Sequence, residues 1–314
     1  MAQGEIIPAC LWGNVCYCCY WEKQHLNKPM PQHHLHTDSD VDKATPAVAS
    51  YAHGRGGVTH PTRHVTRALR KVPEVTVYFW IIKLLTTGMG ETTSDYLVHH
   101  LNPLIAVALG GLGLAVALIL QFSVRRYVPW IYWLAVVMVA IFGTMAADVL
   151  HIGFGIPYLV STAFFAVALA IIFVAWYARE KTLSIHSIYI RPRELFYWAT
   201  VMATFALGTA AGDMTAITLG LGYFSSGVLF AVVIAVPALA YRLFGLNEII
   251  AFWFAYIVTR PLGASFADWG GRSRGLGGLG LGTGQVSLGL AIVIIGFVGY
   301  LTVTHPDSEG EHRA

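Results

Sequence analysis

FWIIKLLTTGMGETTSD, residues 79–95, decides the fold of this chain, because three altered copies of it follow. The copies are YWLAVVMVAIFGTMAAD at 132–148, YWATVMATFALGTAAGD at 197–213 and FWFAYIVTRPLGASFAD at 252–268. Each copy begins with an aromatic residue and a tryptophan, has a glycine ten residues after the tryptophan, and ends on an aspartate five residues after the glycine. Self-similarity over so long a period is the sequence signature of a repeat architecture.

Three positions of each copy form a repeat signature. Its tryptophans are Trp80, Trp133, Trp198 and Trp253. Its glycines are Gly90, Gly143, Gly208 and Gly263. Its aspartates are Asp95, Asp148, Asp213 and Asp268. The distance between successive tryptophans leaves room for two membrane helices in each repeat.

The composition predicts a membrane protein. Only 12% of the residues are charged and 56% are hydrophobic, whereas soluble domains carry about 25% charged residues. From Pro73 to Thr304 the sequence is a series of apolar runs, and a helix needs roughly 20 such residues to span a bilayer. The expected fold is all-α, a polytopic bundle of eight transmembrane helices in four two-helix repeats. The expected helices are 74–98, 102–123, 128–150, 157–178, 193–214, 221–243, 247–268 and 285–304.

The chain divides into a leader, a membrane domain and a tail. Residues 1–70 are polar and irregular, so we expect a disordered cytoplasmic leader there, either an addition peculiar to this chain or the product of a start codon placed too early. Residues 71–304 form the expected membrane domain, and 305–314 a cytoplasmic tail. The expected repeats are about 72–124, 125–180, 191–244 and 246–304.

The placement of Lys and Arg predicts the orientation. The connections that precede the second, third and fourth signatures hold most of the loop cations, namely Arg125, Arg126, Arg179, Lys181, Arg191, Arg193 and Arg242. The connections that follow the signatures hold none until Arg272 and Arg274 in the last one. Because basic loops stay in the cytoplasm, we expect both termini in the cytoplasm and the protein in the cytoplasmic (inner) membrane, in contact with the lipid bilayer.

The repeat signature carries a family resemblance. The chain resembles a group of uncharacterised bacterial membrane proteins built from four tandem repeats, each with two transmembrane segments and a characteristic tryptophan. The resemblance covers roughly residues 72–304, the whole membrane region. It implies the eight-helix architecture and brings no established activity.

The tryptophans and glycines have separate expected roles. In an α-helix each Trp lies about 22 Å from its Asp along the axis and only about 60° from it around the axis. We expect the indoles in the interfacial aromatic belt of the membrane. A small residue follows each glycine by four positions, which permits close helix contact in lipid. The signature helices are therefore expected in the centre, with the others outside, unless the glycines reflect only the general richness of membrane helices in glycine.

The aspartates suggest either function or structure. A carboxylate in a spanning helix is costly unless it is paired, hydrated or protonated, and it usually faces the bundle interior. We therefore expect Asp95, Asp148, Asp213 and Asp268 to meet around a common interior space. The alternative is structural, with each aspartate capping the next segment or holding an outer loop.

The first signature helix carries a further polar stripe. Lys83, Thr87, Glu91 and Ser94 lie on the face of Trp80 and Asp95. The fourth helix has Arg260 on the equivalent face, about one turn from the level of Glu91. We expect an Arg260–Glu91 ion pair, with Lys83 and Thr87 continuing a polar path towards the cytoplasm.

This interior holds more acid than base. Glu91 and the four aspartates face only Lys83 and Arg260, and crowded carboxylates in low dielectric require a cation or protons. Oxygen ligands suit hard divalent metals, so the sequence leaves open whether a divalent metal ion binds here. Three histidines follow an aspartate closely, namely His99, His100 and His151. They could add ligands to a metal ion, sense pH or simply be solvated.

Other signals support no further assignment. The cysteines and histidines of Cys16–Cys19 and His33–His36 fit no standard zinc spacing. The Gly275–Gly284 run lacks the Lys-Ser/Thr of a phosphate loop, and no protease motif is present. We expect no cofactor, no enzyme activity and no nucleic-acid partner, and the oligomeric state is left open.

Two hypotheses follow. The first is a transporter or permease for a small inorganic cation, either a divalent metal or protons, in which Asp95, Asp148, Asp213, Asp268 and Glu91 bind the ion. Arg260, Lys83 and Thr87 then act as counter-charges or gates. The second is a non-transporting membrane scaffold or sensor in which the buried charges form a structural network.

Overall fold

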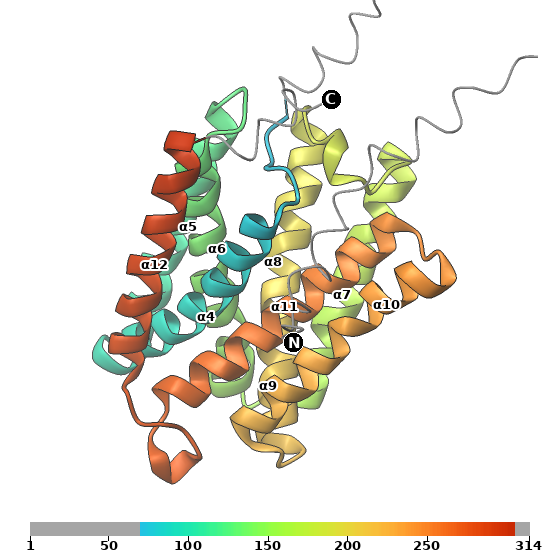
Figure 1. Ribbon diagram of the computed structural model, residues 1–314. Helices are drawn as coiled ribbons and strands as arrows, with labels where there is room; N and C mark the ends of the chain where they lie inside the picture. The colour runs from blue at the N-terminus through green and yellow to red at the C-terminus, as the bar shows by residue number, and fades with distance from the viewer. Residues whose placement is uncertain (1–69, 305–314) are drawn as a thin grey trace, which may run out of the picture.

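The computed structural model describes residues 70–304, and within that range the chain is helical with no strand (Figure 1). The inner helices, those carrying the repeat signature, are α4 (Val77–His100), α6 (Pro129–Asp148), α8 (Arg191–Asp213) and α11 (Glu248–Gly271). The outer helices are α5 (Pro103–Ser123), α7 (Tyr158–Glu180), α9 (Gly222–Val233) with α10 (Ala235–Phe244), and α12 (Thr283–Thr304). The predicted leader and tail lie almost wholly outside the described residues, as do the cysteines.

The apolar helices make this a multi-pass membrane protein. Seven helical segments in the described range are long and apolar enough to cross a bilayer. The inner helix α4 falls short by composition because Lys83, Glu91 and Asp95 interrupt it, although its 24 residues are as many as those of α11. The inner and outer helices differ in burial: 67% of the apolar window of α8 is buried, against 17% of that of α7. The outer helices therefore form the surface exposed to lipid.

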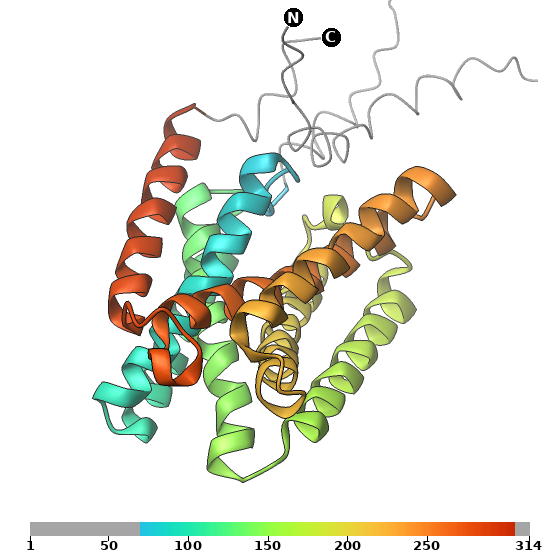
Figure 2. The same ribbon diagram turned by 60° about the horizontal axis from the view of Figure 1, so that its bottom comes forward.

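The inner helices form a closed ring. The neighbours in contact are α4 with α6, α6 with α8, α8 with α11, and α11 with α4. Each outer helix packs on the inner helix of the next repeat, so that α5 lies on α6, α7 on α8 and α9 on α11. The last outer helix, α12, returns to the first inner helix, α4 (Figure 2). The expected central and outer layers are confirmed, and the repeats close cyclically.

Two features of the helices depart from the prediction. The helix expected at 221–243 is broken at Ile234 into α9 and α10. The cause is Pro237, which has no N–H to donate to the carbonyl of Val233. In addition, α6 and α8 each end in a π-helical turn, η2 (Val149–Gly153) and η4 (Met214–Thr218), directly after their signature aspartates. Below, the end of the ring where the inner helices begin is the Trp end, and the opposite end is the Asp end.

Candidate functional site

The signature tryptophans line the inside of the ring at the Trp end, which corrects the expectation that they face the lipid interface. Their exposed fractions are only 1–8%. Each indole packs against the aromatic residue that precedes the tryptophan of the previous repeat. The ring centroids are 5.8 Å apart for Phe79 and Trp133, 5.7 Å for Tyr132 and Trp198, 6.3 Å for Tyr197 and Trp253, and 5.8 Å for Phe252 and Trp80.

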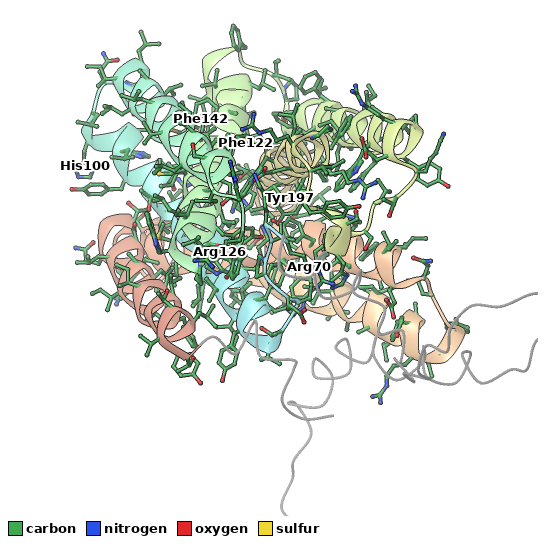
Figure 3. All side chains as sticks on the ribbon, turned by 90° about the horizontal axis from the view of Figure 1, so that it is seen from above. Arg70, His100, Phe122, Arg126, Phe142 and Tyr197 are labelled. Atoms are coloured by element: carbon green, nitrogen blue, oxygen red, sulfur yellow. The ribbon has the colours of Figure 1, made fainter. Side chains whose placement is uncertain are left out.

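We call these eight side chains the aromatic belt of the ring. Tilted and edge-on ring pairs stabilise packing beyond the area they bury, by about 0.5–1.5 kcal/mol each. Stacking on the neighbouring helix therefore holds the indoles inside the ring. The hydroxyls of Tyr132 and Tyr197 also share a 2.5 Å hydrogen bond across the belt. Seen along the bundle, Tyr197 lies among the inner helices, whereas His100 lies at the periphery (Figure 3).

The signature glycines allow the inner helices to approach one another. A Cβ added at Gly143 would lie 2.7 Å from the Cβ of Phe205 on α8. A Cβ at Gly90, Gly208 or Gly263 would collide with Ala140, Arg260 or Thr87. In all four cases the obstructing residue lies seven positions after the tryptophan of the next repeat. The expectation that these glycines mediate close helix contact is confirmed.

Arg260 joins all four inner helices at the centre of the ring. Its Nη2 lies 2.5 Å from Glu91 Oε2, so the predicted ion pair is present. The same nitrogen donates to Thr209 Oγ1 on α8 at 2.7 Å and to Thr144 on α6. Both threonine hydroxyls donate in turn to Glu91 Oε2 at 3.2 Å. Arg260 is fully buried and Glu91 is 2% exposed.

Thr87 contributes to this cluster differently from the prediction. Its carbonyl oxygen accepts a hydrogen bond from Arg260 Nη1 at 2.9 Å. Its hydroxyl turns back and donates to Leu84 O at 2.6 Å. The hydroxyl therefore does not extend a polar path beyond Arg260.

Lys83 lies between the central cluster and the aromatic belt. Its side chain is 1% exposed, and its Nζ is 3.8 Å from the ring centroid of Phe205 and 4.0 Å from that of Tyr256. No atom of the described residues accepts a hydrogen bond from this ammonium group. Two aromatic faces are therefore its main compensation for the loss of water.

The signature aspartates lie at the Asp end in two pairs with different surroundings. Arg272, just after α11, forms ion pairs with Asp95 at 2.8 Å and with Asp268 at 3.3 Å. Burial acts to lower the pKa of Arg272, but the charges of Asp268 and Asp95 outweigh it and raise this pKa above its ordinary value. The structural interpretation, an aspartate that holds an outer loop, therefore describes Asp95 and Asp268.

Asp148 and Asp213 have no such partner. Neither carboxylate forms a hydrogen bond or ion pair within residues 70–304, and neither caps the π-helical turn that follows it. Asp213 is 7% exposed and Asp148 is half-buried. Both interact electrostatically with Glu91 and Asp95. The acidic groups of the four inner helices thus share one interior region.

The histidines are engaged elsewhere. The Nδ1 atoms of His99, His100 and His151 each contact a backbone carbonyl oxygen of a nearby residue, at 2.7–2.8 Å. Among the described residues, no three His, Cys, Asp or Glu side chains are grouped so that they could hold a metal ion. The site consists instead of Lys83 and the Arg260–Glu91 pair towards the Trp end, and of the signature aspartates with Arg272 at the Asp end.

Several participants in these contacts are not among the residues predicted from the sequence. Thr209 lies eleven residues after its tryptophan, as do Glu91 and Thr144, and this shared register was the signal that could have identified it. Arg272 follows the signature and was assigned to a loop. At the Trp end, Lys71 forms a buried 2.5 Å ion pair with Glu194, to which Gln121 also donates at 3.1 Å; no periodicity connects these three positions.

The fold and this interior define a class of protein: a multi-pass helical membrane protein with a closed inner ring of four repeats around buried charges. The chain belongs to the family described as Repeat of Unknown Function (DUF347), which matches residues 78–127, 131–182, 196–245 and 251–306. The expected family of uncharacterised four-repeat proteins is thereby confirmed. No curated protein and no solved structure matches the chain.

Proposed function

We propose that this protein is a non-enzymatic transport protein of the cytoplasmic membrane that moves a small cation, the proton, through the interior of the inner ring. The observation that carries the proposal is the set of buried ionisable groups on the ring axis. Lys83, Arg260 and Glu91 are each at most 2% exposed in the interior of a membrane bundle. Such groups are costly within a bilayer and mark ion or proton pathways.

The charge balance supports a cationic cargo. Three cations, Lys83, Arg260 and Arg272, face Glu91 and the four signature aspartates. Carboxylates this close in low dielectric do not all stay ionised without additional positive charge. Protons or a bound cation supply that charge, and the interior is then neutral enough to be stable.

The grouping of the carboxylates favours protons over a divalent metal, because among residues 70–304 no three of them are placed to ligate one ion. A hard divalent ion needs several oxygen ligands at about 2.0–2.6 Å, whereas Asp148 and Asp213 each stand without a hydrogen bond or ion pair among the described residues. A single carboxylate is enough to accept and release a proton. We assign Asp213 and Asp148 as the proton-binding groups. Asp95 and Asp268 are the groups that hold Arg272 at the Asp end of the ring.

The central cluster and Lys83 then act as the barrier. Arg260 neutralises Glu91 and occupies the ring axis where the four helices meet. Lys83 adds a second positive charge towards the Trp end, where the aromatic belt closes the interior. A cation entering from the Asp end meets carboxylates first and two fixed cations next, so passage requires this barrier to rearrange.

The test is proton flux into proteoliposomes that contain a pH-sensitive dye. Wild-type protein is expected to dissipate a pH gradient faster than protein-free liposomes, and Asp213→Asn is expected to abolish the difference. Glu180→Gln is the matched control, because Glu180 is a carboxylate that is ion-paired with Arg193 at 2.8 Å outside the ring. Equal flux with and without wild-type protein, for protons and for a panel of metal cations, would contradict transport.

A second function is supported by the same cluster. Arg260 contacts all three other inner helices, as expected of a structural network in a membrane scaffold or sensor. Under that hypothesis Arg260→Ala fails to accumulate in the membrane. Under the transport hypothesis the destabilised variant still reaches the membrane and its flux per molecule of protein is altered, so a membrane-fraction blot beside the flux assay separates the two.

A further inference from the structure

The segment that leads into α4, residues 70–76, crosses the Trp end of the ring, and we call it the strap. At one end it runs directly into α4, which Thr76 caps. Near its other end, Lys71 is held on α8 by the 2.5 Å ion pair with Glu194. Because α6 and α11 separate α4 from α8 in the ring, these two helices stand on opposite sides of the axis. The strap therefore passes over the end of the ring, and Figure 3 shows Arg70 over the middle of the bundle.

Backbone hydrogen bonds fix the strap to two connections between helices. The N–H of Lys71 donates to the carbonyl of Ile188 in the α7–α8 connection, at 3.1 Å. The N–H of Tyr127, in the α5–α6 connection, donates to the carbonyl of Arg70 at 2.8 Å. Val72 is only 5% exposed and belongs to the same apolar core as the aromatic belt. The strap therefore closes the Trp end of the ring beside this belt.

The Lys71–Glu194 ion pair is the polar part of this closure. Both side chains are buried, and Gln121 at the end of α5 donates to Glu194 Oε1 at 3.1 Å and to the carbonyl of Lys71 at 3.4 Å. A buried ion pair contributes little net stability because both charges lose water, whereas the loss of one partner leaves the other uncompensated. The pair therefore holds the strap only while both charges are present.

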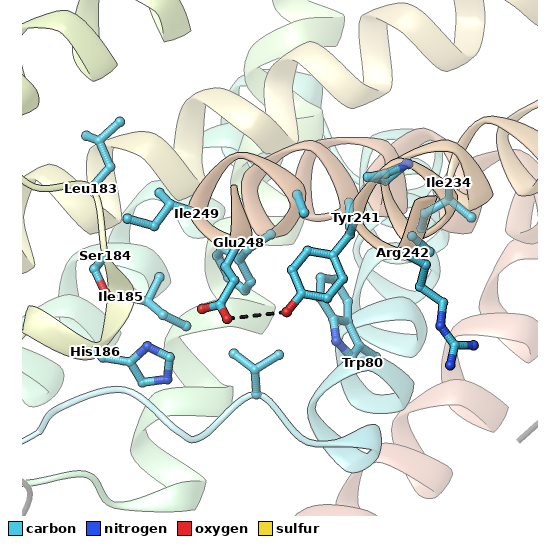
Figure 4. A pocket seen from close by; sticks show the side chains of 16 residues that line it. Trp80, Leu183, Ser184, Ile185, His186, Ile234, Tyr241, Arg242, Glu248 and Ile249 are labelled. Atoms are coloured by element: carbon cyan, nitrogen blue, oxygen red, sulfur yellow. Dashed lines mark hydrogen bonds between the residues drawn. The ribbon is translucent and has the colours of Figure 1, made fainter. Parts of the chain in front are cut away.

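A cavity beside the strap leaves it room to move. Val75 of the strap lines this cavity together with Trp80 and Phe252 of the belt, and Pro237 and Ala238 of α10 line it as well. Its volume of about 110 Å³ is several times the roughly 10–15 Å³ that one water needs. Figure 4 shows the strap, drawn in pale blue, running along one edge of the cavity and into α4. Since closely packed side chains resist displacement, a shift into this space costs less than a shift into the core.

We infer that the strap is the gate at the Trp end of the ring and that the Lys71–Glu194 ion pair is its latch. The inference rests on the proposed proton transport, because it names what controls passage at the Trp end. With the ion pair formed, the strap closes the ring beside the aromatic belt. When the ion pair is lost, the strap shifts towards α10 and the Trp end opens.

The first test locks the strap with a disulfide. Arg70→Cys/Tyr127→Cys is made with the four native cysteines replaced by serine, and the backbone hydrogen bond between the two positions brings their Cα atoms close enough for the bond. Oxidation is expected to reduce proton flux to that of protein-free liposomes, and dithiothreitol to restore it. The matched control is Thr93→Cys/Ser287→Cys, a cross-link at the Asp end whose oxidation should leave flux unchanged.

The second test releases the latch. Glu194→Gln removes the charge and keeps the size of the side chain, and it is expected to raise flux. Movement of the strap is measured separately, as the rate at which a membrane-impermeant maleimide labels Val72→Cys in the cysteine-free background. Labelling should be faster with Glu194→Gln than without it. Glu180→Gln is the matched control, because it breaks an ion pair with Arg193 that holds no residue of the strap, and it should change neither rate.

A second variant guards against misfolding. Lys71→Gln/Glu194→Gln buries no charge and breaks the same latch, so it replaces Glu194→Gln if that variant fails to accumulate, with the same results expected.

Unchanged flux after the strap disulfide has formed would overturn the gate, as would faster labelling of Val72→Cys without a gain in flux. Equal labelling in the Glu194→Gln and Glu180→Gln backgrounds would show that the ion pair is not the latch. Absence of flux from the wild type would contradict the proposed function and the gate together, whereas the labelling rates would still decide whether the ion pair holds the strap.

Discussion

Arg260 shows how a single residue organises the interior. A guanidinium presents five donors in a planar fork, and here it reaches a carboxylate, two hydroxyls and a carbonyl on three different helices. Ala264, one turn further along α11, occupies the register where the other repeats have Glu91, Thr144 and Thr209. The small residue leaves space at that level for the arginine to lie across the ring axis.

Removing one member of this pair should cost more than removing both. Arg260→Met leaves Glu91 as an uncompensated buried charge, and we expect a loss of roughly 3–5 kcal/mol in stability. The double variant Arg260→Met/Glu91→Met buries no charge and should recover most of that loss. The measurement is the thermal unfolding midpoint in detergent for wild type, both single variants and the double variant.

The recovered double variant also separates structure from transport. If Arg260 and Glu91 form the barrier, the double variant inserts, unfolds near the wild-type temperature and shows altered flux. A double variant as unstable as Arg260→Met would refute the compensation. Additive losses from the two single changes would likewise show that the side chains are not energetically coupled.

At the scale of the element, the close packing of the inner helices depends on their signature glycines. Helix association in lipid relies on packing, because the surrounding chains are as apolar as the helix surfaces. The contact between each signature glycine and the next repeat recurs around the whole ring, so one small residue per helix sets the spacing of four interfaces. Three glycines of the outer helix α12 have no such role, since a Cβ at Gly289, Gly296 or Gly299 would meet nothing within 4 Å.

Gly263→Ala should therefore destabilise the protein, whereas Gly289→Ala should not. The added methyl group at residue 263 meets Thr87 across the α11–α4 interface, and overpacking of this kind costs about 1–3 kcal/mol. Thermal unfolding of the two variants in the same detergent checks the difference. Equal midpoints would mean that the α11–α4 spacing adjusts freely.

At the scale of the whole molecule, the four repeats form a closed ring and not an open row. The outer helix of each repeat covers the next inner helix, and α12 completes the circle on α4. One contact across this closure is the hydrogen bond between Thr93 Oγ1 and Ser287 Oγ, at 2.5 Å. Because the ring has no free end, every inner helix is shielded from lipid by an outer one.

This closure predicts a specific cross-link. In a background with Cys10, Cys16, Cys18 and Cys19 replaced by serine, Thr93→Cys/Ser287→Cys should form a disulfide on mild oxidation. Thr93→Cys/Thr302→Cys is the control, because residue 302 lies about 22 Å further along α12. A gel-mobility shift restricted to the first pair is the expected outcome. A shift in both pairs or in neither would contradict the packing of α12 on α4.

Much of this arrangement was predictable from local patterns. The recurrence of Trp, Gly and Asp at one spacing determined the repeats, the helical class and the central place of the signature helices. The Arg260–Glu91 pair was also predictable, because two opposite charges at neighbouring heights on equivalent faces have few other partners in an apolar bundle. Thr144 and Thr209 lie at the same distance from their tryptophans as Glu91 does. That shared position also indicates that their hydroxyls lie at the level of the ion pair.

The sequence by itself thus determined the helical class, the grouping of the helices in repeats and the pairing of opposite charges at the centre. Only the tertiary structure decided that the tryptophans stack inside the ring, that Arg272 returns to Asp95 and Asp268, and that α12 covers α4. The physical reason is that these contacts depend on which helices are neighbours around the ring, and no local pattern specifies that order. Helical periodicity specifies which face a residue occupies, whereas the order of helices around the ring specifies what that face meets.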